Sequence, residues 1–175
     1  MILPILQIAA IAPVAIYLIR WRAGLRRRNA RSWESLVARL QPGWSARELS
    51  VHFLQKEGLN TTPAETWERI QGYRGMRAMY HNAGVMLEMA DFAGRNSDTG
   101  DSIDRVLLET LRNDAMQIRL GALKVLACCA FNQASESVRS NAFQVASMYT
   151  GMAARTAQLL QVCSPEMLPN FVAAM

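Results

Sequence analysis

The segment from Leu108 to Cys129, LETLRNDAMQIRLGALKVLACC, carries one of the two most regular helical patterns in the chain. Its apolar residues recur in alternating steps of three and four, at Leu108, Leu111, Ala115, Ile118, Ala122, Val125 and Cys129. An average step of 3.5 residues keeps these side chains on one face of an α-helix, which is what an antiparallel bundle helix needs to pack at a shallow angle. We therefore expect a long helix that begins at Asp101 or Ser102 and ends near Phe131.

A second seam with the same alternation follows a short break at Asn132–Ser135. It comprises Val138, Ala142, Val145, Tyr149, Met152, Thr156 and Leu159. Pro165 and Pro169 then bracket a short terminal piece that either packs back or frays. The second seam predicts another long helix, antiparallel to the first.

A third long helix is predicted upstream of the polar loop at residues 94–101. Thr62, Pro63 and Glu65 together supply an N-cap, a proline in the first turn and the acidic residue of a capping box. The helix should run to Phe92 or Ala93, although glycines at 72, 75 and 84 weaken its continuity. A shorter helix is expected from Ser45, which opens another capping box, to about Glu57.

The N-terminal segment differs sharply in composition from this body. Ile2 to Ile19 is an uncharged, mostly apolar run of 18 residues. As a helix it would span about 27 Å, just short of a hydrocarbon core of about 30 Å. We expect residues 1–19 to form a transmembrane anchor, with a membrane interface at Tyr17, Arg20, Trp21, Arg22, Arg26, Arg27, Arg28 and Arg31. A helix buried in a soluble core is an alternative, because 18 residues is the lower edge of the spanning range.

The charges that flank the run predict its orientation. All of them lie on its C-terminal side, which predicts an N-terminus outside and a cytoplasmic body at the inner membrane. A cleaved signal peptide, the other alternative, normally carries its positive charge before the apolar run. Residues 20–41 are expected to form a basic juxtamembrane amphipathic helix that ends at Gln41-Pro42-Gly43.

The net charge of +5 belongs to this juxtamembrane cluster and not to the body. Six of the 19 basic residues lie in 20–31, which leaves 13 basic against 14 acidic residues in 32–175. The cluster favours contact with anionic headgroups, whereas the nearly neutral body argues against nucleic acid. A DNA-binding helix-turn-helix over residues 45–80, with Arg69, Arg74 and Arg77 on its second helix, is kept as an alternative function.

Residues with reactive or metal-binding side chains are sparse. No nucleophile motif, phosphate loop or zinc spacing is present, so we expect no catalytic site and no cofactor. The adjacent pair Cys128 and Cys129 lies on or beside a seam and should be buried and unreactive. A metal-dependent helical enzyme is kept as a second alternative, using His81, Glu88 and Asp91, with Glu65, Glu68, Glu109 and Asp114 as further ligands.

Four methionines on the third predicted helix have two interpretations. Met76, Met79, Met86 and Met89 either fill the core or form an adaptable apolar surface for a partner.

We expect an all-α protein, a single N-terminal transmembrane helix followed by an antiparallel bundle of three long helices and one or two short ones. Its three segments are an anchor (1–19), a juxtamembrane helix (20–41) and a cytoplasmic bundle (42–175). The leading functional hypothesis is a membrane-anchored interaction or assembly module that binds a protein partner or forms a homo-oligomer.

Overall fold

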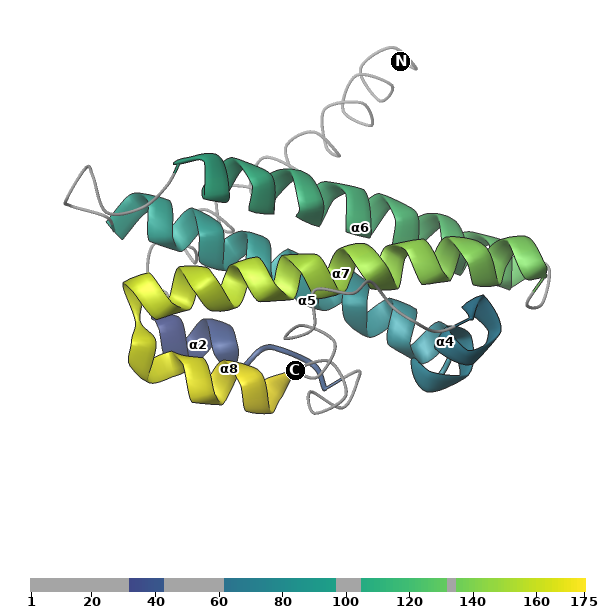
Figure 1. Ribbon diagram of the computed structural model, residues 1–175, viewed down its shortest axis with the longest axis horizontal. Helices are drawn as coiled ribbons and strands as arrows, with labels where there is room; N and C mark the ends of the chain where they lie inside the picture. Colours follow the sequence, from purple (N-terminus) through teal and green to yellow (C-terminus); the bar gives the residue numbers. More distant parts are fainter. Residues whose placement is uncertain (1–31, 43–61, 97–104, 132–134) are drawn as a thin grey trace, which may run out of the picture. The chain divides into compact units, whose positions relative to one another are not determined.

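The computed structural model describes residues 32–42, 62–96, 105–131 and 135–175, and every regular element in them is a helix (Figure 1). The long helices are α5 (Tyr73–Asn96), α6 (Arg105–Phe131) and α7 (Glu136–Cys163). The short ones are α2 (Trp33–Val37), α4 (Pro63–Arg69), the 3-10 helix η1 (Pro165–Met167) and α8 (Leu168–Ala174). The prediction of an all-α bundle with three long helices is confirmed for this part of the chain.

Both predicted seams face the core. On α6 the six positions from Leu108 to Val125 are buried, and Cys129 is half-buried against the core. On α7 all seven seam positions, from Val138 to Leu159, are buried. The 3.5-residue period therefore identified the packed face of each helix correctly.

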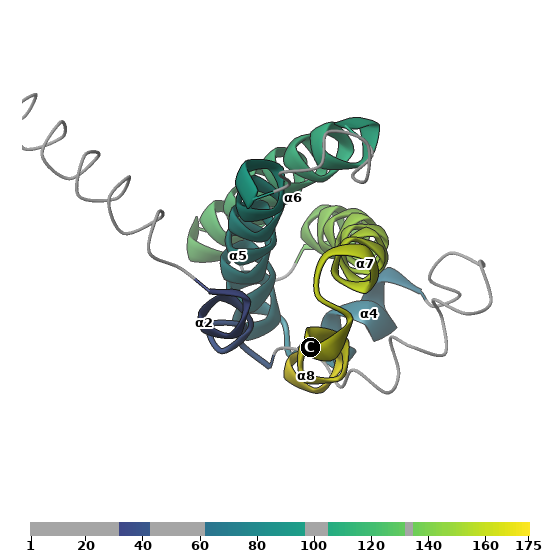
Figure 2. The ribbon, with the colours of Figure 1, turned by 90° about the vertical axis from the view of Figure 1, so that its left-hand side faces the viewer.

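The long helices are arranged so that α6 lies at one edge of the bundle. It packs against α5 and α7, and α5 and α7 also pack against each other. The short helices α2 and α8 contact α5 and α7, respectively, on the side away from α6 (Figure 2). The chain end packs back, because Phe171 and Met175 are buried in the same core. The outward face of α6 is thus covered by none of the other helices that the structure describes.

The third predicted helix is correct at its start and wrong in its continuity. Thr62 accepts a hydrogen bond from the backbone N–H of Glu65, whose side chain accepts one from the backbone N–H of Thr62, so the predicted capping box forms. The helix then breaks after Arg69, because Gln71 and Gly72 adopt φ values of 58° and 57°. This left-handed turn separates α4 from α5.

Residues 33–40, the last part of the segment predicted as a juxtamembrane helix, pack into the core of the bundle. Leu36, Val37 and Leu40 are buried, and Trp33 packs edge-on against Phe92 at a ring separation of 4.9 Å. From Trp33 onward the chain forms one compact unit. Residues 33–40 therefore belong to the bundle, because their apolar side chains complete the core beside α5 and α8.

Candidate functional site

Helix α6 carries a second apolar stripe on the face opposite its buried seam. Met116, Leu120 and Leu123 are 62 %, 64 % and 49 % exposed, and the alanines at 127 and 130 are exposed as well. Their steps of four, three, four and three residues keep all five on one face of the helix. Met116 and Ala130 are 14 residues apart, so the stripe is about 21 Å long. We call these five residues the outer stripe.

The outer stripe stands out against the rest of the same face. One and two turns before Met116 that face carries polar residues, Asn113 and Glu109, which are exposed as expected of a helix surface. From Met116 to Ala130 the positions in line with Met116 are apolar, and the exposed polar residues Gln117 and Lys124 lie to one side of them. Contiguous apolar exposure of this kind marks interaction sites, whereas isolated apolar residues on a surface are ordinary.

On the side of the outer stripe that faces α5, two arginines of α6 contact residues of α5. Arg119 donates from Nη2 to the Tyr80 hydroxyl at 2.9 Å, and its guanidinium lies 4.7 Å from the centre of the Tyr80 ring. One heptad earlier, Arg112 donates from Nε to Asp91 Oδ1 at 3.0 Å. These contacts fix α5 antiparallel to α6 and hold two positive charges along one side of the stripe.

The flank toward α7 is neutral to basic. Gln117 and Lys124 are exposed there, and residues 115–131 contain no aspartate or glutamate. Further round the helix, Arg155 of α7 donates to Asp114, and a Cβ on Gly121 would lie only 2.7 Å from Val145 Cγ2. Gly121 therefore permits the close approach of α6 and α7, which leaves the outer stripe facing outward.

The two adjacent cysteines at the end of α6 differ in exposure. Cys128 is exposed, so the expectation that both would be buried is wrong for it; a helix turns about 100° per residue, and only Cys129 reaches the seam. Burial, and to a lesser degree the neighbouring Cys128, raises the pKa of the Cys129 thiol. Burial also raises the pKa of Cys163. Raised values disfavour the nucleophilic thiolate at both positions.

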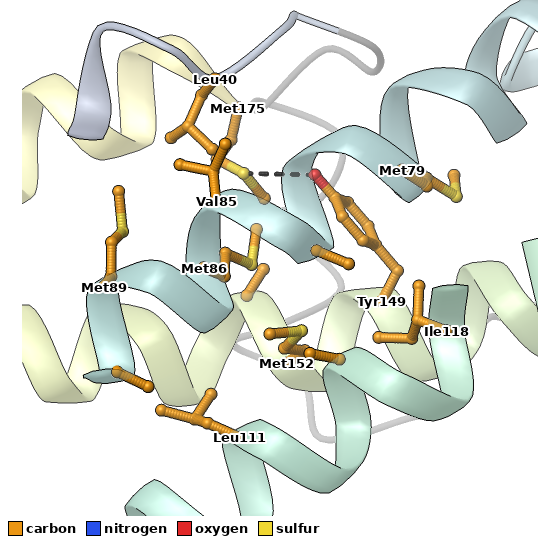
Figure 3. Packing of buried hydrophobic residues seen from close by; sticks show 14 of the residues in the cluster. Leu40, Met79, Val85, Met86, Met89, Leu111, Ile118, Tyr149, Met152 and Met175 are labelled. Carbon is orange, nitrogen blue, oxygen red and sulfur yellow. Dashed lines mark hydrogen bonds between the residues drawn. The ribbon is translucent and has the colours of Figure 1, made fainter. Parts of the chain in front are cut away.

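The structure resolves the two interpretations of the methionines on α5. Met76, Met79, Met86 and Met89 are all buried. Figure 3 shows the last three among side chains of α6 and α7, including Leu111 and Ile118. They fill the core and do not form an exposed partner surface, because the face of α5 that carries them is the one covered by its neighbours.

The candidate metal ligands are held in separate contacts. Arg39 forms an ion pair with Glu88, and its carbonyl accepts a hydrogen bond from His81 Nε2 at 3.1 Å. Asp91 is paired with an arginine of α6, and Glu65 belongs to the capping box. Within the described residues no group of three or more His, Cys, Asp or Glu side chains is placed to hold a metal ion.

Sequence reasoning missed a buried polar network around Asn82. The Asn82 side chain accepts from the Gln41 N–H and donates to the Gln41 carbonyl, both at 2.8 Å, and also donates to the Tyr149 hydroxyl at 2.9 Å. Tyr149 in turn donates to Met175 Sδ at 3.4 Å (Figure 3). Burial raises the pKa of Tyr149 above its usual range, against a smaller opposite effect of the Asn82 hydrogen bond. All the polar groups of Asn82 are satisfied, so the network joins α5, α7 and the chain after α2 without offering a ligand site.

Several predicted features lie outside the described residues. They are the anchor at 1–19, the interface residues Tyr17 to Arg31, and the first part of the helix-turn-helix hypothesis, residues 45–61. Of the arginines in that hypothesis, Arg69, Arg74 and Arg77 are exposed on α4 and α5. Among the described residues, no helix is long and apolar enough to cross a bilayer.

Comparisons with protein-family models, with curated proteins and with solved structures find no match to this chain. In the part of the chain that the structure describes, the outer stripe of α6 is the surface that gathers the most exposed large apolar side chains on one helix face.

Proposed function

We propose that the chain is a non-catalytic, membrane-anchored interaction module that binds a protein partner, or a second copy of itself, at the cytoplasmic face of a membrane. In this proposal the apolar run at residues 2–19 is the anchor, and the arginines between Arg20 and Arg31 hold the body on the cytoplasmic side. The helical bundle presents the binding surface.

The observation that carries the proposal is the outer stripe. A bundle helix that exposes five aligned apolar residues over about 21 Å leaves that apolar surface in water, which costs about 25 cal/mol for every Å² that a partner could cover. The flanking side chains of Gln117, Arg119 and Lys124 form a polar rim around it. An apolar centre with a polar rim is the usual anatomy of a protein interface.

Two measurements on the full chain test the proposal. Membranes from cells that express it are washed at high salt and alkaline pH; the full chain should stay in the membrane, and a variant that lacks residues 2–19 should be released. A photoreactive amino acid is then placed at Leu120, with the equally exposed Val162 of α7 as the control position. Irradiation should give a discrete protein adduct from position 120 and none from position 162. Release of the full chain by washing contradicts the anchor, and the absence of a protein adduct at position 120 contradicts the interaction surface.

A further inference from the structure

Building on the proposed function, we propose that the occupant of the outer stripe is the outer stripe of a second copy, packed antiparallel about a two-fold axis that passes between Gly121 and Ala122. A closed two-fold contact uses the same patch on both subunits, so the patch must complement itself when one copy is reversed. The outer stripe meets this requirement in the size of its side chains and in the charge of its flanks.

The sizes match when the two helices are centred on that axis. Met116 then faces the partner's Ala127, and Leu120 faces the partner's Leu123. Each large side chain in the first half of one stripe meets a smaller or equal one in the second half of the other, which lets the layers interdigitate. The polar Asn113 meets the partner's Ala130 at the edge, where water can still reach its amide.

The charges select the antiparallel direction. In an antiparallel pair, like flanks of the two helices meet, so Gln117 lies beside the partner's Lys124, and Arg119 lies beside the partner's Leu126. In a parallel pair, opposite flanks meet, and Arg119 would face the partner's Lys124 on both sides of the interface. Like charges at such positions are destabilising.

The same charges select one register among the antiparallel ones. Sliding the helices by one heptad in one direction brings Arg119 against the partner's Arg119. Sliding them by one heptad in the other direction brings Lys124 against the partner's Lys124. Only the register centred between Gly121 and Ala122 avoids both pairs while it keeps the five apolar residues in contact.

The symmetry also agrees with the proposed anchoring. The two-fold axis of an antiparallel helix pair is perpendicular to both helices, so it can coincide with the normal of a membrane. Two copies related by such an axis have their N-terminal segments on the same side, and both can be anchored in one bilayer. Confinement to that bilayer favours the encounter of the two stripes.

The experiment introduces and then reverses charges at the flanks of the outer stripe by substitution in the full chain. The mass of each variant is measured by analytical ultracentrifugation over a range of concentrations, in mild non-ionic detergent at low salt. The variant Gln117→Lys places a new positive charge beside the partner's Lys124 twice in each dimer and should weaken dimerisation about fivefold, since each such pair costs about 0.5 kcal/mol. Adding Lys124→Glu to it should restore the dimer, because each pair then carries opposite charges. In a parallel dimer Arg119 faces the partner's Lys124, so Lys124→Glu alone would strengthen association there. In the antiparallel dimer the new glutamate lies beside the neutral Gln117, and this single variant should leave dimerisation nearly unchanged. A single variant that strengthens the dimer overturns the antiparallel arrangement.

Two exposed positions of similar character provide the matched control. Leu120→Gln should weaken the dimer at least about tenfold, which is 1.4 kcal/mol, whereas Val162→Gln should leave it unchanged. Both positions are mostly exposed, so melting curves by circular dichroism should show that each variant is folded. A chain that is monomeric at every concentration, or a dimer that ignores Leu120→Gln, overturns the proposal, as does a double variant that fails to recover.

The photoreactive residue at position 120 separates this inference from the proposed function. An adduct of twice the chain mass supports the antiparallel dimer. An adduct with a different protein overturns the dimer and leaves the proposed interaction module standing. A lipid adduct, or a cross-link within one chain, overturns both, because the outer stripe then rests on the bilayer or is covered by another part of the same chain.

Discussion

Two substitutions on α6 separate the stability of the fold from the association of the folded protein. Ile118 is fully buried and Leu120 is 64 % exposed, yet the two side chains have the same number of carbon atoms and lie two residues apart. Ile118→Ala deletes buried carbons and should cost 2–5 kcal/mol, the approximate range for such deletions in cores. Burying a whole leucine is worth about 1.5–3 kcal/mol, so the buried third of Leu120 predicts a loss of about 0.5–1 kcal/mol, partly offset by the higher helix propensity of alanine.

The assay is urea unfolding of the full chain in non-ionic detergent, followed by circular dichroism at two protein concentrations. At the lower concentration, where a dimer would dissociate, Ile118→Ala should lower the free energy of unfolding by several times as much as Leu120→Ala. At the higher concentration the Leu120 variant should lose the stabilisation that association gives to the parent chain. Equal losses at the two positions at low concentration would refute the assignment of an inner and an outer face to α6.

Two further predictions concern the Asn82 network and the glycines of α5. Tyr149→Phe should cost about 1 kcal/mol, because the Asn82 side chain loses a hydrogen-bond acceptor. The raised pKa of the buried phenol should also make the parent chain lose stability as the pH rises above 10. Urea melts between pH 8 and 11 should show a smaller loss of stability in the variant than in the parent chain. Identical pH profiles would exclude this contribution. Gly75→Ala would place a Cβ 1.9 Å from the Ile70 carbonyl oxygen and should destabilise by more than about 2 kcal/mol, whereas Gly84→Ala, with its nearest neighbouring atoms at 4.0 Å, should stabilise by up to about 1 kcal/mol. Thermal melts in which both glycine variants shift in the same direction would contradict this account of the turn.

The bundle could be predicted from the sequence because the patterns that indicate its helices involve residues close together in the chain. Each seam is a regular spacing of apolar residues along the sequence. Apolar side chains at that spacing can be buried only if the helix packs lengthwise against a neighbouring helix. The capping box at Thr62 is equally local, since its donor and acceptors lie within four residues. These features hold in the structure without any knowledge of which helix packs against which.

The features that sequence reasoning missed depend on residues that are far apart in the chain or on strained backbone. Asn82 bonds to Gln41 and Tyr149, which lie 41 and 67 residues away, so no window of sequence contains the network. The break between α4 and α5 needs a positive φ at Gln71, a residue type with no special preference for that conformation. Gly72 and Gly75 indicated that the predicted helix could be interrupted here, but glycine also occurs within unbroken helices, as Gly84 does in α5.

Helix α6 shows why the site was harder to predict than the fold. Two sets of residues on it follow a 3.5-residue period, and only one set can face the bundle. Ala115 and Ala122 in the inner seam allow α5 and α7 to approach closely, so the larger Met116, Leu120 and Leu123 are left outside. Covering this second apolar face would be favourable, and α6 lies at the edge of the described bundle, where a second copy can reach it. The proposed dimer would account for this surplus of apolar residues on α6, which the packing of the described helices leaves exposed.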